Sequence, residues 1–477
     1  MKIGITTFIT ACAAALALSA IHPVAATAAD IPSQELVLAD SPLALDRAVE
    51  TALAANRSVR SADLAAESAA QKLAETKSRF GLSLKLSGNY QRVESSSKLA
   101  FPLSYYEVAP VNISGSDLFA ISNPVPKIQL IEYSLNPEWQ HTGDLNVVKP
   151  VFTFGKKEKA VSAARKGKDI AALDSKLARI NLAAEVKALF HGAILAGEAV
   201  KLLESSVSRS ESHMKDVVEL FNSGLGIKLD VIRSEVELQS AREKLATARK
   251  NRTLAMRALA NIIGMPYEKE LKITDRDAFE NIELAPLDHY LALAARNRPE
   301  FEQIRKGRDA ANLAAELEKN KPTVAFAGQW SFHSRGSMFT PQDSWRAVLA
   351  VEYPFFDQGL ASAKSAQARL RAGNLDLKMD DLSNGVKIQT EAAYLQIIEA
   401  KDRLETSRII LSAAEEGYRI ASLSYKEGFA TQLDVIDAEH NLTSAGLNFA
   451  SAKRDYETAK AGLASACGLV GFDKRPD

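Results

Sequence analysis

The stretch FNSGLGIKLDV, residues 221–231, decides the fold together with its near-copy YKEGFATQLDV at residues 425–435. Each stretch lies between two long segments with a helical pattern of apolar residues. Gly224 and Gly428 stand where the first helix should end, because glycine adopts the left-handed conformation without a Cβ clash. Leu-Asp-Val follows, which brings an acidic residue close to the start of the next helix. Each stretch therefore predicts the turn of a helical hairpin.

The two turns belong to an internal repeat with a constant offset of 428 − 224 = 204 residues. The same offset relates Glu235 to Glu439 and Gly264 to Gly468. A constant spacing over such a span indicates a duplicated unit, and repeats decide the fold before other patterns are considered.

Charge and motifs exclude several classes of function. Lysine plus arginine and aspartate plus glutamate each number 59, so no basic field predicts a nucleic-acid partner. There is no phosphate loop, dinucleotide fingerprint, HExxH or paired-cysteine motif. The histidines lack ligand spacing and are expected at the surface or in a lumen: His191, His213, His289, His333 and His440. We therefore expect no enzyme activity, no cofactor and no metal site.

The N-terminus reads as a targeting segment. Residues 1–29 combine Lys2, an apolar run and small residues before Asp30, which is typical of a secretory signal peptide. Cys12 faintly resembles a lipidation site, but the apolar run continues past it, so acylation is not expected. Cys467 is then the only cysteine of the mature chain, which leaves no internal disulfide. Beyond the signal, no stretch approaches the roughly 20 apolar residues of a spanning helix.

The pattern predicts two structural repeats joined by a linker. The first repeat, 30–266, has helices in 43–80, strands at 82–92 and 144–154, and long helices at 155–221 and 229–264. Residues 267–286 form the linker. The second repeat, 287–477, has helices in 287–320, strands at 323–332 and 345–355, and long helices at 359–425 and 433–468.

The strand segments alternate with a period of two. Leu84, Leu86 and Tyr90 share one face of the first segment, with polar residues opposite, and Leu349 and Val351 share a face of the fourth. This alternation is typical of membrane barrel strands and equally of a soluble sheet with one wet face. Four strands cannot close a bilayer-spanning barrel, whereas three chains would supply 3 × 4 = 12.

The first repeat carries an insertion between its strands. Gly88 and Gly328 are 240 residues apart, so the first copy has 240 − 204 = 36 extra residues. They fall in residues 91–143, which contain several prolines and little periodicity. We expect an external loop there, because surface loops tolerate insertions.

The chain resembles the TolC-like outer membrane efflux proteins over nearly all of its mature length. The resemblance rests on the duplicated G-x4-LDV turn and its trailing E-x2-L-x-SA segment, on the P-x-F-x2-G strand exit, and on the Asn-Arg joints at 56–57 and 297–298. It implies a mainly α fold with a membrane β-barrel part. Two tandem helix–hairpin–long-helix repeats would form a homotrimer with a shared 12-stranded barrel and a long α-helical periplasmic tunnel.

The resemblance also implies a function and partners. The expected function is an outer membrane channel-tunnel, the exit duct of a tripartite efflux or type I secretion system in a Gram-negative bacterium. Its partners would be two copies of itself, a periplasmic adaptor, an inner-membrane pump and outer membrane lipid, without nucleic acid. The alternative is a periplasmic coiled-coil scaffold or adaptor with a soluble β domain.

Site residues follow by motif match. Asp434 and Asp437 correspond to the aspartates that constrict the periplasmic mouth, and Tyr425 and Asp230 complete the implied gate. Three copies would form two acidic rings. The alternative is that Asp434 only provides a favourable charge at a helix N-terminus. Ala430 replaces the arginine of the family latch, for which Arg233 or Lys228 are candidate substitutes.

The turn residues themselves match the tips that adaptors contact in the family. They are Gly224 and Leu225 in the first turn and Gly428 and Phe429 in the second. The alternative is that the two glycines only end helices.

Overall fold

The computed structural model describes residues 42–92, 98–107, 125–134, 139–266, 271–274, 282–333 and 343–471. The expected signal peptide and Cys12 lie outside these residues. The chain divides into two units, Met1–Leu43 and Ala44–Asp477, and every described helix and strand lies in the second.

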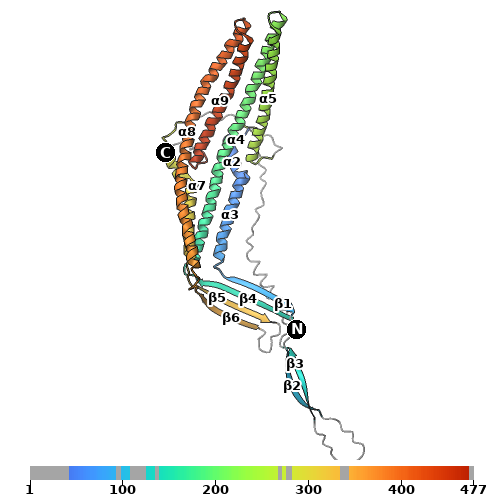
Figure 1. The fold of residues 1–477 in the computed structure, drawn as a ribbon, viewed down its shortest axis with the longest axis vertical. Coiled ribbons are helices and arrows are strands. Elements are labelled where there is room, and N and C mark those ends of the chain that lie inside the picture. Colours follow the sequence, from blue (N-terminus) through green and yellow to red (C-terminus); the bar gives the residue numbers. More distant parts are fainter. Residues whose placement is uncertain are drawn as a thin grey trace, which may run out of the picture. The chain divides into compact units, whose positions relative to one another are not determined.

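Each half of the chain contributes two short helices, strands of one sheet and a long helical hairpin (Figure 1). The first half has α2 (Leu45–Ala55), α3 (Arg57–Ser78), α4 (Lys156–Asn222) and α5 (Lys228–Ile262). The second half has α6 (Leu287–Asn297), α7 (Pro299–Leu317), α8 (Leu360–Lys426) and α9 (Gln432–Ala466). Both α4 and α8 have 67 residues, which corresponds to roughly 100 Å of helix. No helix in the described part of the chain is apolar enough over sufficient length to cross a membrane.

The two halves share one antiparallel sheet with the order β1-β4-β5-β6. Its strands are β1 (Ser83–Arg92), β4 (Trp139–Phe152), β5 (Thr323–His333) and β6 (Asp343–Glu352). β4 pairs with β5, which joins the halves, and the register shifts between Pro150 and Phe152. Proline has no N–H to donate to the ladder, so an irregularity at this point is expected. β1 and β6 are the outer strands of this sheet.

The inserted segment of the first half contains two strands that the sequence did not predict. β2 (Lys98–Glu107) pairs with β3 (Val125–Ser134) in a separate two-stranded sheet, with Phe101 opposite Ile131. The expectation of a segment without regular structure was wrong for these residues. Pro102 lies within β2, opposite Leu130, because each strand of a two-stranded ribbon has an unpaired edge where proline is tolerated.

Large apolar side chains project from the shared sheet into solvent. Leu84 is 60% exposed, Tyr90 67%, Trp345 79%, Leu349 64% and Val351 67%. Large apolar side chains exposed in such number on one sheet are unusual for a monomeric soluble protein and indicate contact with a membrane or another chain.

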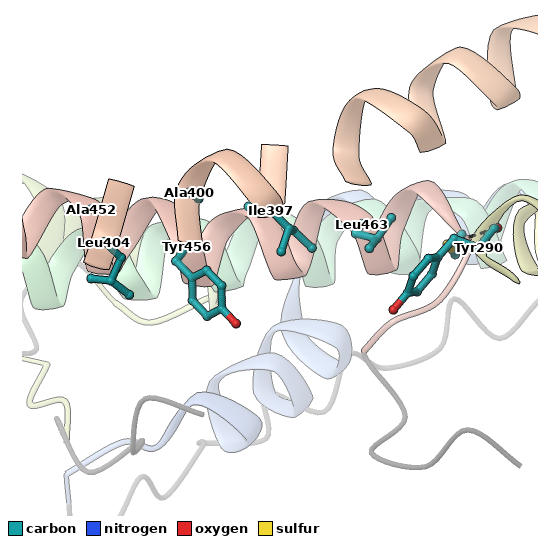
Figure 2. Packing of buried hydrophobic residues seen from close by; sticks show 9 residues of the cluster. Tyr290, Ile397, Ala400, Leu404, Ala452, Tyr456 and Leu463 are labelled. Atoms are coloured by element: carbon teal, nitrogen blue, oxygen red, sulfur yellow. Dashed lines mark hydrogen bonds between the residues drawn. The ribbon is translucent and has the colours of Figure 1, made fainter. Parts of the chain in front are cut away.

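The helices pack along their lengths rather than around one central core. α4 contacts α3, α5, α7 and α9, and α8 contacts α7 and α9. Figure 2 shows the main cluster of the second half, where Tyr290, Ile397, Tyr456 and Leu463 meet between α6, α8 and α9. Tyr456 is fully buried and its hydroxyl accepts a hydrogen bond of 3.2 Å from the Ile282 amide. Alanines among these residues let neighbouring helices approach closely.

The lone described cysteine belongs to this cluster. Cys467 is 1% exposed, and burial raises the pKa of its thiol to about 11. A thiol that stays protonated in an apolar site is inert, so Cys467 acts as a core residue.

The need for glycine in the α8–α9 turn can be tested by comparing Gly428 with Gly417, which lies inside α8. Gly428 has φ +81°, a region that costs an L-residue about 1–2 kcal/mol. Gly428→Ala should lower the free energy of unfolding by that amount, measured by chemical denaturation followed by circular dichroism. Gly417, exposed within α8 and with nothing within 4 Å of an added Cβ, is the control. Gly417→Ala should raise stability by up to about 1 kcal/mol, and equal effects of the two changes would contradict the assignment.

Candidate functional site

The two helical hairpins end in turns of the same construction. At the α4–α5 turn, the Gly224 amide donates to the Phe221 carbonyl (3.1 Å) and the Leu225 amide to the Leu220 carbonyl (3.0 Å). This pair of bonds is a Schellman motif, and the positive φ of Gly224, +76°, permits it. The α8–α9 turn repeats both bonds, from Gly428 to Tyr425 and from Phe429 to Ser424. The predicted role of both glycines as helix C′ residues is confirmed.

The residue after each turn glycine has a large apolar side chain that is exposed to solvent. Leu225 is 80% exposed and Phe429 is 84% exposed. The turn therefore fixes the backbone while leaving one large apolar group free at each tip. Capping explains the glycines but not these side chains.

Asp434 forms a capping box at the start of α9. Its carboxylate accepts from the Thr431 amide (2.7 Å) and hydroxyl (2.7 Å), and its own amide donates to the Thr431 hydroxyl (3.3 Å). The hydrogen bond from the Thr431 side chain, aided by that from its amide, lowers the pKa of Asp434. The capping role left open by the sequence is thus present. The Asp434 side chain is also solvent-exposed, as is Asp437 three residues later.

Tyr425 and Asp230 come together with a histidine that the sequence did not single out. The Tyr425 ring contacts the His213 ring edge-on, with centroids 5.1 Å apart. Burial raises the pKa of Tyr425, and the charges of Asp230 and Asp216 raise it further. His213 belongs to α4, Asp230 to α5 and Tyr425 to α8, so this group spans both hairpins.

His213 has a lowered pKa. Burial is the main cause, and the Lys426 charge acts in the same direction, whereas Asp216, Asp230 and Glu439 raise the pKa in part. The Nε2 atom of His213 is buried without a protein partner, as is Ser210 Oγ. Both residues line a small pocket with room on the order of one water molecule. Neutral imidazole is therefore favoured at this position.

A buried polar network crosses between the hairpins beside this pocket. Glu439 of α9 accepts from Arg209 Nε (2.6 Å), Arg209 Nη2 (3.0 Å) and Ser206 Oγ (2.8 Å) of α4. Gln432 Nε2, also on α9, donates to the Asp230 carbonyl and to Ser234 Oγ of α5, both at 2.7 Å. Sequence reasoning missed this network because its members lie about 200 residues apart without a motif.

Lys228 and Arg233, the candidate substitutes for the latch arginine, do not link the two hairpins. Lys228 Nζ lies 5.7 Å from the centre of the Phe221 ring, on its own hairpin, and Arg233 is exposed. Ala430 is partly buried in the turn. Neither cation is therefore placed as a bridge between the hairpins.

The other histidines show no metal-binding arrangement. In the described part of the chain, no three histidine, cysteine, aspartate or glutamate side chains gather closely enough to hold a metal ion. His440 Nε2 lies 2.6 Å from Glu237 Oε1, and His289 is exposed. His191 is only 9% exposed, so the expectation of a surface or lumen position was wrong for this residue.

Comparisons with known proteins match the repeat and the fold. The family model described as outer membrane efflux protein matches residues 48–265 and 290–469. The alkaline protease secretion protein AprF of Pseudomonas aeruginosa is 24% identical over 344 residues, which is 69% of this chain and 70% of AprF.

Solved outer membrane proteins share the architecture. VceC from Vibrio cholerae aligns with a TM-score of 0.67 and 17% identity, over 90% of this chain and 97% of VceC. The CmeC outer membrane channel of Campylobacter jejuni aligns with a TM-score of 0.70 and 16% identity, over 91% of this chain and 87% of CmeC. The family model covers both repeats and both hairpin turns, and with them the fold described above: the chain belongs to the outer membrane efflux protein family, whose members are transport ducts rather than enzymes.

Proposed function

We propose that three copies of this chain form the exit duct of a tripartite efflux or type I secretion system. The observation that carries the proposal is the four-stranded sheet with outer strands β1 and β6 and large apolar side chains exposed on it. Unpaired strand edges cannot face hydrocarbon, because each lone backbone N–H or C=O costs several kcal/mol there. Pairing β1 of one copy with β6 of the next satisfies the edges, and cyclic symmetry closes the ring.

Three copies supply twelve strands from this sheet, enough for a closed barrel in the outer membrane. The long hairpins α4–α5 and α8–α9 of three copies then form the wall of a periplasmic tunnel. Exposed apolar residues along α8, among them Leu370, Leu377, Ile388 and Ile409, provide surface for a neighbouring copy. The β2–β3 hairpin, inserted between β1 and β4, lies on the external side in this arrangement.

The periplasmic mouth is closed by the start of α9. Asp434 and Asp437 are exposed, three residues apart on one helix, and so face the same direction. Three copies form two acidic rings that repel anions and hold cations. The hydrogen bonds from Thr431 lower the pKa of Asp434 and so favour its ionised form. Tyr425 and Asp230, on the two hairpins, support the closed arrangement.

The tips are the surface for a periplasmic adaptor, which connects the duct to an inner-membrane pump. Leu225 and Phe429 present apolar side chains at the tips, where the glycine turns hold them rigidly. Exposed aromatic and aliphatic anchors on a rigid backbone are the usual centre of a protein–protein contact.

The oligomer is the first test of this function. The envelope fraction is extracted with detergent and run on a denaturing gel with and without boiling. We expect a trimer band that heat converts to monomer, because paired edges and apolar faces resist the detergent. A chain that is released without detergent and runs as a monomer in both lanes would rule out the duct.

The acidic gate is tested by removing the charges of Asp434 and Asp437 while keeping the hydrogen bonds that cap the start of α9. Asp434→Asn combined with Asp437→Asn should raise single-channel conductance in planar bilayers and reduce cation selectivity. Asparagine still accepts a hydrogen bond from Thr431, so α9 keeps its start. Glu391→Gln, at an exposed position in the middle of α8, is the control and should leave conductance unchanged. Equal conductance of the gate variant and the wild type would remove both aspartates from the gate.

The adaptor surface is tested with a photo-crosslinking residue in living cells. Placed at Phe429 or Leu225, it should capture a periplasmic adaptor identified by mass spectrometry. Tyr106, 67% exposed in β2, is the matched aromatic control and should not capture it. Capture from Tyr106 but not from the tips would place the adaptor elsewhere.

The lowered pKa of His213 predicts a pH dependence. A folded pKa below the unfolded value of about 6.5 makes a contribution to folding stability that is fully present above that pH. This stability is lost as pH falls through the folded pKa. The dissociation temperature of the trimer should therefore fall between about pH 7.5 and pH 5.5, and His213→Gln should reduce that fall. His289→Gln, at an exposed position, should retain the full pH dependence, and an equal effect of both variants would contradict the role of His213.

A further inference from the structure

Glu439 is the one charged side chain that is buried in the described part of the chain, at 5% exposure. It lies on α9, five residues after Asp434 and two after Asp437. A buried carboxylate is costly unless it is paired and hydrogen-bonded, so its position calls for a specific partner.

That partner comes from the other hairpin. Arg209 of α4 binds both carboxylate oxygens, through Nε at 2.6 Å and Nη2 at 3.0 Å. Ser206 of α4 donates to the same carboxylate at 2.8 Å, and Thr443 of α9 at 3.1 Å. The Arg209 guanidinium also lies 5.6 Å from the centre of the Tyr418 ring of α8. The bidentate geometry makes this the strongest class of side-chain hydrogen bond.

The internal repeat contains two equivalent positions for such an ion pair, and only one of them has both charged residues. The offset of 204 residues relates Glu439 to Glu235 and Arg209 to Ala413. Glu235 is exposed, and Ala413 carries no charge. In a ring of three chains, the α4–α9 contact within a chain corresponds by the repeat to a contact of α8 with α5 of the next chain. The ion pair thus strengthens the contact within a chain and not its counterpart between chains.

We propose that Arg209 and Glu439 are the positioning pair that holds the second hairpin against the first and so keeps Asp434 and Asp437 in the closed gate. This inference rests on the duct proposed above. Opening the mouth moves α9 away from α4 and must separate Glu439 from Arg209. The pair supplies, within one chain, a polar link between the hairpins, which the methyl group of Ala430 cannot make.

The experiment compares open probability in planar bilayers for Glu439→Gln, Arg209→Gln and the double variant. Each single change should raise the open probability on the order of tenfold, the effect of losing a charge-assisted hydrogen bond from the closed state. The double variant should add little to either, because both changes break the same interaction. Arg209→Lys keeps the positive charge but loses the two parallel hydrogen bonds of the guanidinium, so it should give a smaller increase in open probability.

The control is a second ion pair between the same helices. Lys453 and Glu198 also join α9 to α4, at 3.1 Å, but are more exposed, at 32% and 23%. Lys453→Gln should leave open probability unchanged. An unchanged open probability in Glu439→Gln, or an equal rise in Lys453→Gln, would overturn the proposal.

Two further outcomes are informative. If Glu439→Gln and Arg209→Gln fail to form a heat-labile trimer, the test rests on Arg209→Lys instead. An open probability equal to that of the wild type in Arg209→Lys would then overturn the proposal. If the wild-type protein itself forms no channel, the duct fails, which is distinct from a wild-type channel that the variants do not alter.

Discussion

Unpaired backbone at the two margins of the four-stranded sheet is the constraint on which the rest of the structure depends. β1 and β6 each present a row of N–H and C=O groups on their outer side, while one face of each strand carries large apolar side chains that are exposed. Water would satisfy the backbone but not the side chains, and hydrocarbon would satisfy the side chains but not the backbone. Only another strand beside each margin satisfies both.

The helices follow from the same requirement. The proposed closed ring of strands would fix where each chain leaves the membrane, and α4 and α8 begin shortly after β4 and after the segment that follows β6. Gly155 and Gly359 turn the chain into these helices at the N-cap positions, with φ of 82° and 84°. Helices of 67 residues cannot form a compact core, so their stability comes from small-residue contacts along their length. The chain then has to specify where the hairpins meet, and the buried network of Glu439, Arg209 and Gln432 provides that specificity near the tips.

Features set by neighbouring residues, such as turns and helices, could be predicted from the sequence, whereas contacts between residues far apart in the chain could not. The turn glycines were predicted because only glycine enters the left-handed region freely, and the long helices lie within a residue or two of the predicted bounds. The β2–β3 ribbon was missed because Pro102 obscured the alternation of Leu99, Phe101 and Leu103. The Arg209–Glu439 pair was missed because no motif relates side chains 230 residues apart. His213 was set aside for lack of ligand spacing, although its importance comes from burial beside Tyr425.

Disulfide trapping across the sheet margins tests the central claim most directly. Leu84→Cys in β1 is combined with single cysteines scanned along β6, in a background where the buried native thiol is replaced by alanine (Cys467→Ala). If β1 of one chain pairs with β6 of the next, neighbouring positions will cross-link under mild oxidation. Denaturing gels without reductant will then show covalent dimers and trimers. Cross-links at no position along β6, in protein that is folded and inserted in the outer membrane, would contradict the account.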